Sequence, residues 1–268
     1  MIGYGSPDGP EQRGHDGRTT MPQSPGPTAL WLVRHGESLG NLADAQAQEH
    51  GQGRLELDVR DPDVPLSSTG EAQAEALGAW LAGLPADQQP TTVLSSPFAR
   101  AAGTAERAVA ASGLDLTIRF DERLRERDFG AFDGMTREGI RAEFPDEARR
   151  RELLGKFYYR PPGGESWADV ALRVRSLLAT EALRHDGERL VCVSHQAVIM
   201  VFRYVLEELS EAQLLEIDRH EQVANTSVTR YELTTGGAFA LAGFNGVEHL
   251  AHPDDAPVTE ENDVPSPA

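Results

Sequence analysis

A short apolar segment that ends abruptly at an Arg-His-Gly triplet constrains this chain more than any other feature of its sequence. Residues 29–33 read ALWLV, and Arg34, His35 and Gly36 follow directly. An apolar run of this length is typical of a buried strand in an α/β sheet, and such sheets bind ligands at the carboxyl ends of their strands. The triplet is therefore expected at a ligand-binding edge. Glycine permits a tight turn there, and a fixed cation beside a histidine favours an anion such as phosphate.

A second segment repeats this pattern late in the chain. Residues 189–195 read RLVCVSH, an apolar run that ends in His195 and is followed by Gln196 and an apolar helical segment. The pattern predicts two strands that end in histidine at the same edge of the sheet. Arg100 lies about one turn into the helix expected after another short strand, at residues 91–96. It could reach the same edge, or it could be an ordinary surface arginine.

The order of the segments predicts a three-layer α/β/α sandwich with a mainly parallel central sheet. Ser68 and Glu71 form the pattern of a capping box in front of an amphipathic helix. A third strand is expected at residues 116–120. Residues 227–233 and 238–244 predict a β-hairpin, which adds an antiparallel edge.

Two further segments are candidates for a place near the ligand-binding edge. Residues 42–65 hold several glycines, prolines and acids, and they predict a long irregular loop that could form part of a lid. Residues 137–159 predict a helical stretch with a cluster of three arginines at 149–151. In an acidic chain this cluster could be a substrate-facing rim or a solvated helix face, and the sequence leaves both interpretations open.

Composition restricts the class of protein. The chain has 268 residues and a formal charge of −18, which argues against nucleic acid as a partner because phosphate backbones bind basic surfaces. No run approaches the ~20 apolar residues of a membrane helix, and no secretory signal is evident. Cys192 lies inside an apolar run and is expected to be an inert core residue. We expect a cytoplasmic protein with one domain at residues 28–251, a disordered leader at 1–27 and a disordered acidic tail at 252–268.

The motifs LVRHGES, SSPFARAAGTAE, LRERDFG, PGGES and VSHQ resemble, in order and approximate spacing, those of the histidine phosphatase superfamily, also called phosphoglycerate mutase-like. The resemblance covers roughly residues 28–244. Within the superfamily, GKFYYRPPGGES and SHQAV are most similar to the fructose-2,6-bisphosphatase and broad-specificity phosphatase branch. Arg137, Trp167 and Met200 stand where that branch carries tyrosine, tyrosine and arginine, which help to hold the sugar phosphate. The resemblance therefore leaves the substrate open.

The resemblance implies catalytic roles for five residues. His35 would be the nucleophile that forms a phosphohistidine, and Glu126 would protonate the leaving oxygen and then activate water. Arg34, Arg100 and His195 would surround the transferring phosphoryl group and balance its charge. No metal or other cofactor is implied, because the arginines neutralise the charge that Mg²⁺ balances elsewhere.

Other residues are expected to assist or to stand apart from the site. Asn41 and Gln196 are candidates for lesser phosphate contacts, and Lys156, Tyr158 and Arg160 are candidates for binding the leaving group. The remaining histidines lack metal-ligand spacing and are expected at the surface; they are His15, His50, His185, His220, His249 and His252.

The resemblance predicts a metal-independent phosphomonoesterase, of the histidine acid phosphatase kind, that acts on a small phosphorylated metabolite such as a sugar phosphate. A phosphoglycerate mutase is the alternative enzyme, which would return the phosphoryl group to substrate and would be activated by a bisphosphorylated primer. A non-catalytic phospho-ligand or protein-binding module would instead bind phosphate without turnover. We expect no membrane partner. The hairpin edge could form a homodimer or could simply be protected.

Overall fold

A six-stranded sheet forms the centre of the computed structural model, which describes residues 26–181 and 184–250. Apart from Gly26 and Pro27, the leader and the tail expected from the sequence lie outside the described residues. The strand order is β3-β2-β4-β1-β5-β6. The strands are β1 (Ala29–Arg34), β2 (Thr92–Ser95), β3 (Ile118–Phe120), β4 (Arg189–Ser194), β5 (Val228–Leu233) and β6 (Phe239–Gly246).

The pairing of the strands confirms the expected mainly parallel sheet with an antiparallel hairpin at one edge. Strands β3, β2, β4 and β1 are parallel, whereas β5 is antiparallel to β1 and β6 is antiparallel to β5. In the register of β1 and β4, Arg34 lies opposite Ser194. The two central strands therefore end side by side, and the histidine that follows each strand emerges at the same edge of the sheet.

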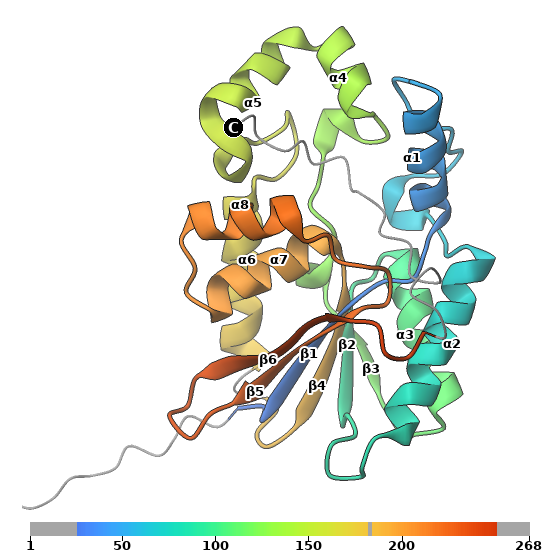
Figure 1. The fold of residues 1–268 in the computed structure, drawn as a ribbon, viewed down its shortest axis with the longest axis vertical. Coiled ribbons are helices and arrows are strands. Elements are labelled where there is room, and N and C mark those ends of the chain that lie inside the picture. Colours follow the sequence, from blue (N-terminus) through green and yellow to red (C-terminus); the bar gives the residue numbers. More distant parts are fainter. Residues whose placement is uncertain (1–25, 182–183, 251–268) are drawn as a thin grey trace, which may run out of the picture.

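Helices cover both faces of the sheet (Figure 1). Helices α2 and α3 lie on one face, and α6 and α7 lie on the other, with α8 beside them. Side chains of the central strands alternate between these two apolar cores, as the two-residue period of a strand requires. The helices are α1 (Leu39–Glu49), α2 (Ser68–Gly83), α3 (Ala99–Ser112), α4 (Arg137–Glu143), α5 (Pro145–Tyr158), α6 (Trp167–Glu181), α7 (Gln196–Leu206) and α8 (Glu211–His220).

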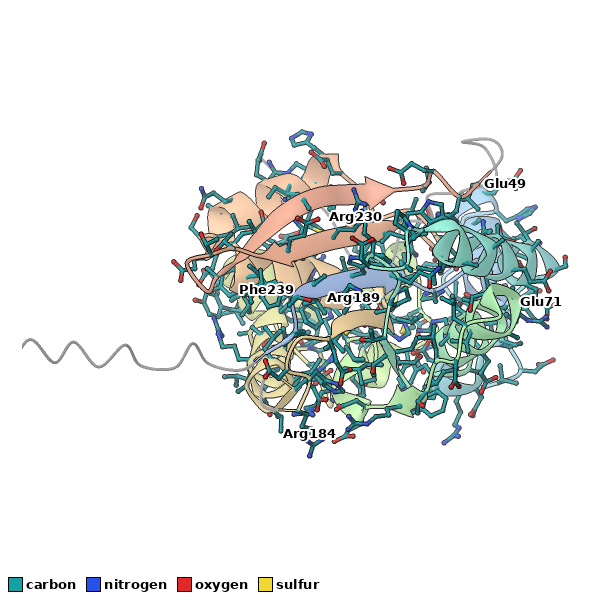
Figure 2. All side chains as sticks on the ribbon, turned by 90° about the horizontal axis from the view of Figure 1, so that it is seen from below. Glu49, Glu71, Arg184, Arg189, Arg230 and Phe239 are labelled. Atoms are coloured by element: carbon teal, nitrogen blue, oxygen red, sulfur yellow. The ribbon has the colours of Figure 1, made fainter. Side chains whose placement is uncertain are left out.

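Three of these helices lie beyond the carboxyl ends of the parallel strands. Figure 1 shows α1, α4 and α5 at this end of the molecule. Figure 2 shows the opposite end, where Arg189 and Phe239 begin strands β4 and β6. Among the described helices, none combines the length and the apolar character that crossing a membrane requires.

Helix α1 corrects the expectation of an irregular segment throughout residues 42–65. Ser38 caps this helix, because its Oγ accepts a hydrogen bond from the Asn41 backbone N–H at 3.2 Å. The Asn41 side chain in turn accepts a hydrogen bond from the Ser38 backbone N–H at 3.0 Å. Asparagine thus takes the place of the Glu or Gln of the usual capping box, and only residues after the helix are irregular.

Other helix boundaries also differ from the sequence expectations. Ser67, rather than Ser68, is the N-cap of α2. The single helical stretch expected at 137–159 is two helices, α4 and α5, which meet at Phe144. Helix α8 was not expected, although Ser210 and Gln213 form a capping box in front of it.

Candidate active site

His35 lies at the first position after β1 and is fixed by its backbone. Its N–H donates to the Ser194 carbonyl at 2.9 Å, and its carbonyl accepts from Asn225 Nδ2 at 3.0 Å. The ring Nδ1 lies 2.7 Å from the Gly36 carbonyl. A carbonyl can only accept, so Nδ1 carries the proton in this contact, and a neutral ring then keeps its lone pair on Nε2.

Burial keeps the His35 ring neutral. It lowers the pKa of His35 well below 6.5, and the charges of Arg100 and Arg34 lower it further, against a smaller opposing effect of the Gly36 carbonyl. A neutral imidazole with a defined tautomer is the nucleophilic form of histidine.

The loop that carries His35 packs directly against the first turn of α2. A Cβ atom on Gly36 would lie 2.6 Å from the Gly70 carbonyl oxygen, and a Cβ atom on Gly70 would lie 2.0 Å from the Glu37 carbonyl oxygen. The Gly36 N–H donates to Thr104 Oγ1 of α3 at 3.0 Å. Glycine at these two positions therefore allows a backbone contact that holds the histidine loop in place.

His195 lies at the end of β4 and faces His35. The two ring centroids are 5.1 Å apart, and His195 Nε2 lies 2.9 Å from Ser96 Oγ. Burial, followed by the charges of Arg100 and His35, lowers the pKa of His195 well below 6.5. Its Nδ1 lies 3.8 Å from Glu126 Oε2. The structure thus brings both histidines and this carboxylate together in a buried site.

Glu126 comes from the segment after the short 3₁₀ helix Glu122–Leu124. Its side chain is buried, and Oε1 accepts from the Arg127 N–H at 2.7 Å. Arg173 of α6 donates to the Glu126 carbonyl at 3.3 Å, which ties this segment to the core helix. Glu126 is accordingly a positioned and buried carboxylate, whereas the other acids of the same charged run are partly buried or exposed.

The two arginines of the site differ in what holds them. Arg34 is fully buried, and its guanidinium donates to the Val223 carbonyl at 2.5 Å. Arg100 lies in the first turn of α3 and donates to the Asp61 carbonyl at 2.8 Å. It also forms an ion pair with Asp61 Oδ1 at 2.9 Å. Both guanidiniums lie close enough to His35 to lower its pKa.

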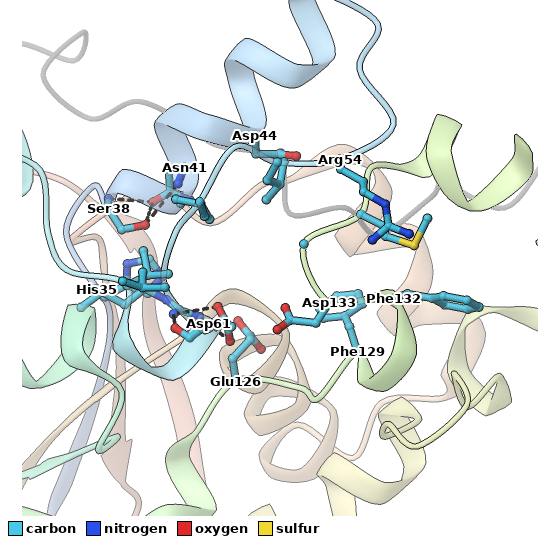
Figure 3. Close-up of a pocket in the computed structure, with 18 residues that line it drawn as sticks. His35, Ser38, Asn41, Asp44, Arg54, Asp61, Glu126, Phe129, Phe132 and Asp133 are labelled. Carbon is cyan, nitrogen blue, oxygen red and sulfur yellow. Dashed lines mark hydrogen bonds and ion pairs between the residues drawn. The ribbon is translucent and has the colours of Figure 1, made fainter. Parts of the chain in front are cut away.

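A cavity of about 310 Å³ opens beside His35 and Glu126 (Figure 3), and Arg100 also lines it. This volume is sufficient for one small molecule. Three aspartates share the wall, namely Asp44 of α1, Asp61 and Asp133. The apolar part of the wall includes Leu55, Leu57, Val59, Phe129, Phe132 and Met135. The segment after α1, which was expected to form part of a lid, therefore lines the cavity.

Two predicted phosphate contacts occupy different positions. Asn41 lines the cavity, but its Oδ1 already accepts hydrogen bonds from Ser38. Gln196 is buried at the start of α7 and donates to Gln222 at 2.6 Å. It is not among the residues that line the cavity.

The three predicted leaving-group contacts also do not line the cavity. Each side chain is held by a carboxylate elsewhere: Asp218 for Lys156, Glu211 for Tyr158 and Asp169 for Arg160. The ion pair of Lys156 is buried and 2.6 Å long. A role for these three residues in substrate binding stays a prediction.

The arginine cluster and the remaining histidines lie outside the cavity. Arg149 and Arg150 are exposed on α5 and pair with acids of their own helix, which favours the solvated-face interpretation. His185 is buried between Glu181 and Glu188, so the expectation of a surface position is wrong for it. His249 is partly buried, His50 and His220 are exposed, and His15 and His252 lie outside the described residues.

Sequence reasoning did not identify the aspartates of the cavity or Ser96. Asp61 lies in a segment of several acids, and Asp133 lies in a glycine-rich turn, so neither has a pattern of its own. Ser96 directly follows β2, and its place at a strand end was the available signal. Within residues 26–181 and 184–250, no three or more His, Cys, Asp or Glu side chains form a group that could hold a metal ion.

Comparisons with known proteins agree with this geometry. A family model for the histidine phosphatase superfamily (branch 1) matches residues 30–245. The probable phosphoglycerate mutase GpmB of Salmonella paratyphi C (strain RKS4594) is 31% identical over 239 residues, which cover 87% of this chain and 97% of the relative.

Two solved structures are also similar. A mycobacterial glucosyl-3-phosphoglycerate phosphatase, in complex with VO3, has a TM-score of 0.62 and 27% identity, with 82% of this chain and 99% of that chain covered. Bacillus stearothermophilus YhfR has a TM-score of 0.66 and 28% identity, with 82% and 98% covered.

Proposed function

The chain belongs to the histidine phosphatase superfamily, branch 1, and on that premise we propose that it hydrolyses a small phosphorylated metabolite through a phosphohistidine. The observation that carries this proposal is the neutral His35 ring, with its proton held by the Gly36 carbonyl, facing a cavity that Arg100 and Glu126 also line. A phosphate monoester is the ligand class that uses a neutral nucleophile, fixed cations and a proton-transferring carboxyl group together.

In the first step, the substrate phosphoryl group binds among Arg34, Arg100 and His195. His35 Nε2 attacks the phosphorus, a P–N bond forms, and the bond from phosphorus to the leaving oxygen breaks. Glu126, protonated at this stage, transfers its proton to that oxygen, so the product leaves as an alcohol. The fixed guanidiniums stabilise the charge on the phosphoryl oxygens, which is the largest contribution to catalysis of this transfer.

In the second step, water attacks the phosphohistidine. The Glu126 carboxylate, now deprotonated, takes a proton from the water as the new P–O bond forms and the P–N bond breaks. Inorganic phosphate departs, and His35 returns to its neutral form. Glu126 is protonated again and ready for the next substrate, so protons balance over the cycle.

Phosphate release in the presence of EDTA tests this proposal. The unaltered chain should hydrolyse p-nitrophenyl phosphate and members of a panel of phosphorylated sugars and acids, and His35→Ala should abolish release. Mass spectrometry of enzyme quenched under alkaline conditions should detect phosphorylation at His35. The matched control is His220→Ala, an exposed histidine of α8 outside the cavity. Equal rates for the His35→Ala variant and the unaltered chain would overturn the mechanism.

A phosphoglycerate mutase is the second candidate, because the Salmonella relative carries that name. The same residues would act, but the phosphohistidine would return its phosphoryl group to substrate. Conversion of 3-phosphoglycerate to its 2-isomer, dependent on a bisphosphorylated primer and followed by NMR, would support this candidate. Phosphate binding with neither release nor isomerisation would identify a non-catalytic module.

A cytoplasmic location and a small-molecule partner belong to this proposal. The chain has a single cysteine, Cys192, and burial raises the pKa of its thiol, as expected for an unreactive core residue. The assignment to the fructose-2,6-bisphosphatase branch stays a prediction, as does a homodimer.

A further inference from the structure

The cavity beyond His35 is the space for the leaving group, and its polar wall is acidic. Asp61 and Asp133 both line the cavity, and Figure 3 shows the Asp133 carboxylate pointing toward the side of Asp61 and Glu126. Asp44 of α1 contributes a third aspartate at the outer wall and accepts a hydrogen bond from Gln48 at 2.8 Å. This acidic wall does not fit a substrate that carries a second anionic group besides its phosphoryl group.

The charge already present at the cavity opposes a further negative charge. Burial, followed by the neighbouring charge of Asp61, raises the pKa of Asp133. The negative charges of Asp61 and Asp133 would also disfavour a carboxylate or a second phosphate on the substrate.

The cations of the wall do not offset this effect. Arg54 and Arg100 are the cationic side chains among the described residues that line the cavity. Arg100 pairs with Asp61, and the proposed mechanism assigns it to the transferring phosphoryl group. Arg54 forms a 2.8 Å ion pair with Glu143 of α4, so its charge is largely balanced.

We propose that the leaving group carries no second anionic group and instead donates hydrogen bonds, from hydroxyl or amine groups, to Asp61 and Asp133. Carboxylate oxygens accept only, so they select donors. The apolar wall, with Phe129 and Phe132, packs against the carbon skeleton of the same group. This inference rests on the proposed function. His35 and Arg100, which line the same cavity, bind the phosphoryl group. Asp61 and Asp133 restrict which phosphomonoesters can bind.

Two pairs of substrates that differ in one charged group test the inference. Glycerol 3-phosphate and 3-phosphoglycerate differ only by a hydroxymethyl group in place of a carboxylate. Phosphoethanolamine and phosphoserine differ only by the added carboxylate. The member without the carboxylate should have the higher kcat/KM in each pair, by at least about tenfold, and comparison between the pairs distinguishes hydroxyl from amine donors.

Asp133→Asn tests the origin of the preference. This variant should reduce the preference for glycerol 3-phosphate over 3-phosphoglycerate about tenfold, the order of effect of one unit charge about 10 Å away at an effective dielectric constant of about 20. The matched control is Asp63→Asn, next to the cavity but exposed and paired with Arg60, which should leave the ratio unchanged. Thermal unfolding should show that both variants fold.

The outcomes separate the two proposals. Equal or higher kcat/KM for the carboxylate-bearing members, or an unchanged ratio in Asp133→Asn, would overturn the inference while leaving the phosphatase in place. Absence of His35-dependent turnover of every ester, including p-nitrophenyl phosphate, would overturn the proposed function and this inference with it.

Discussion

Among single residues, Arg100 stands out because it must bind two anionic groups. In the structure its guanidinium pairs with the Asp61 carboxylate at 2.9 Å, and in the proposed mechanism it must also bind the substrate phosphoryl group. A phosphate that reaches Arg100 therefore shares it with a carboxylate of like charge. We expect Asp61→Asn to strengthen inhibition by inorganic phosphate by about tenfold, because this variant removes the charge and keeps the backbone carbonyl that anchors Arg100.

The inhibition constant for inorganic phosphate, measured against p-nitrophenyl phosphate at constant pH, checks this expectation. Asp63→Asn of the same 3₁₀ turn (Asp61–Asp63) is the control and should leave the constant unchanged. Weaker phosphate inhibition in Asp61→Asn would show instead that the Asp61 carboxylate orients Arg100 for its ligand, and that the two anions do not compete.

The residues that sequence analysis located are those that follow strands. His35 and His195 each follow an apolar run, and this pattern made their position at one edge of the sheet predictable from sequence. The register of β1 and β4 places them side by side. Asp61 and Asp133 were not, because loop segments without periodicity bring them to the cavity, and their approach depends on tertiary packing. The contacts of Lys156 were equally inaccessible, since its partner Asp218 belongs to the unexpected helix α8.

At the scale of elements, the site depends on how closely α2 approaches the loop after β1. A Cβ atom on Gly70 would lie 2.0 Å from the backbone carbonyl oxygen of Glu37. Gly70→Ala must therefore displace the His35 loop or the helix. We expect a loss of kcat of about 100-fold, the order of effect of a displacement of about 1 Å in a catalytic group. We also expect a loss of about 1–3 kcal/mol in the free energy of unfolding.

Gly83→Ala, in the same helix, is the matched control. A Cβ atom there meets nothing within 4 Å, so we expect unchanged kcat and a stability equal to or slightly above that of the unaltered chain. Steady-state kinetics and urea unfolding on both variants give the comparison. Full activity in Gly70→Ala would contradict the view that this contact fixes the nucleophile.

Element boundaries show where local patterns suffice. The parallel strands and the hairpin were predictable because apolar runs and turn residues mark them directly. Helix α1 was missed because its segment is rich in glycine and acids beyond the helix, and because asparagine replaces glutamate in its capping box. The cap of α2 was displaced by one residue, because Ser68 and Glu71 fit the capping-box pattern, whereas the Gly70 N–H donates to Ser67 Oγ in the structure.

At the scale of the whole molecule, the chain carries a formal charge of −18 and yet buries a cationic site. Arg34 and Arg100 lie inside, near neutral histidines, whereas the excess of acids lies mainly elsewhere. Long-range attraction therefore does not guide a phosphate ester toward this protein. Recognition of the anion depends on short-range contacts with guanidiniums held by backbone carbonyls, and the energy of folding holds these groups in place before any ligand arrives.

The same burial makes the stability of the whole molecule depend on pH. The folded chain keeps His35 and His195 neutral well below pH 6.5, and burial lowers the pKa of His249 to about 4. In the unfolded chain these histidines take up protons as pH falls through about 6.5. The unfolded state then binds more protons than the folded state, so the free energy of unfolding decreases as pH falls from about 7 to 5.5. Each of the two fully buried rings contributes a slope that approaches about 1.4 kcal/mol per pH unit below its unfolded pKa.

Urea unfolding of the phosphate-free protein across this pH range measures the slope. Carboxyl groups with lowered pKa values, such as those of Asp121 and Asp169, add to the loss of stability mainly below about pH 5, outside the window. His195→Gln removes one of the buried rings and should reduce the slope by up to about 1.4 kcal/mol per pH unit, whatever its effect on stability at pH 7. An unchanged slope in this variant would show that His195 is protonated in the folded protein, which would conflict with its complete burial beside His35 and with the nearby charge of Arg100.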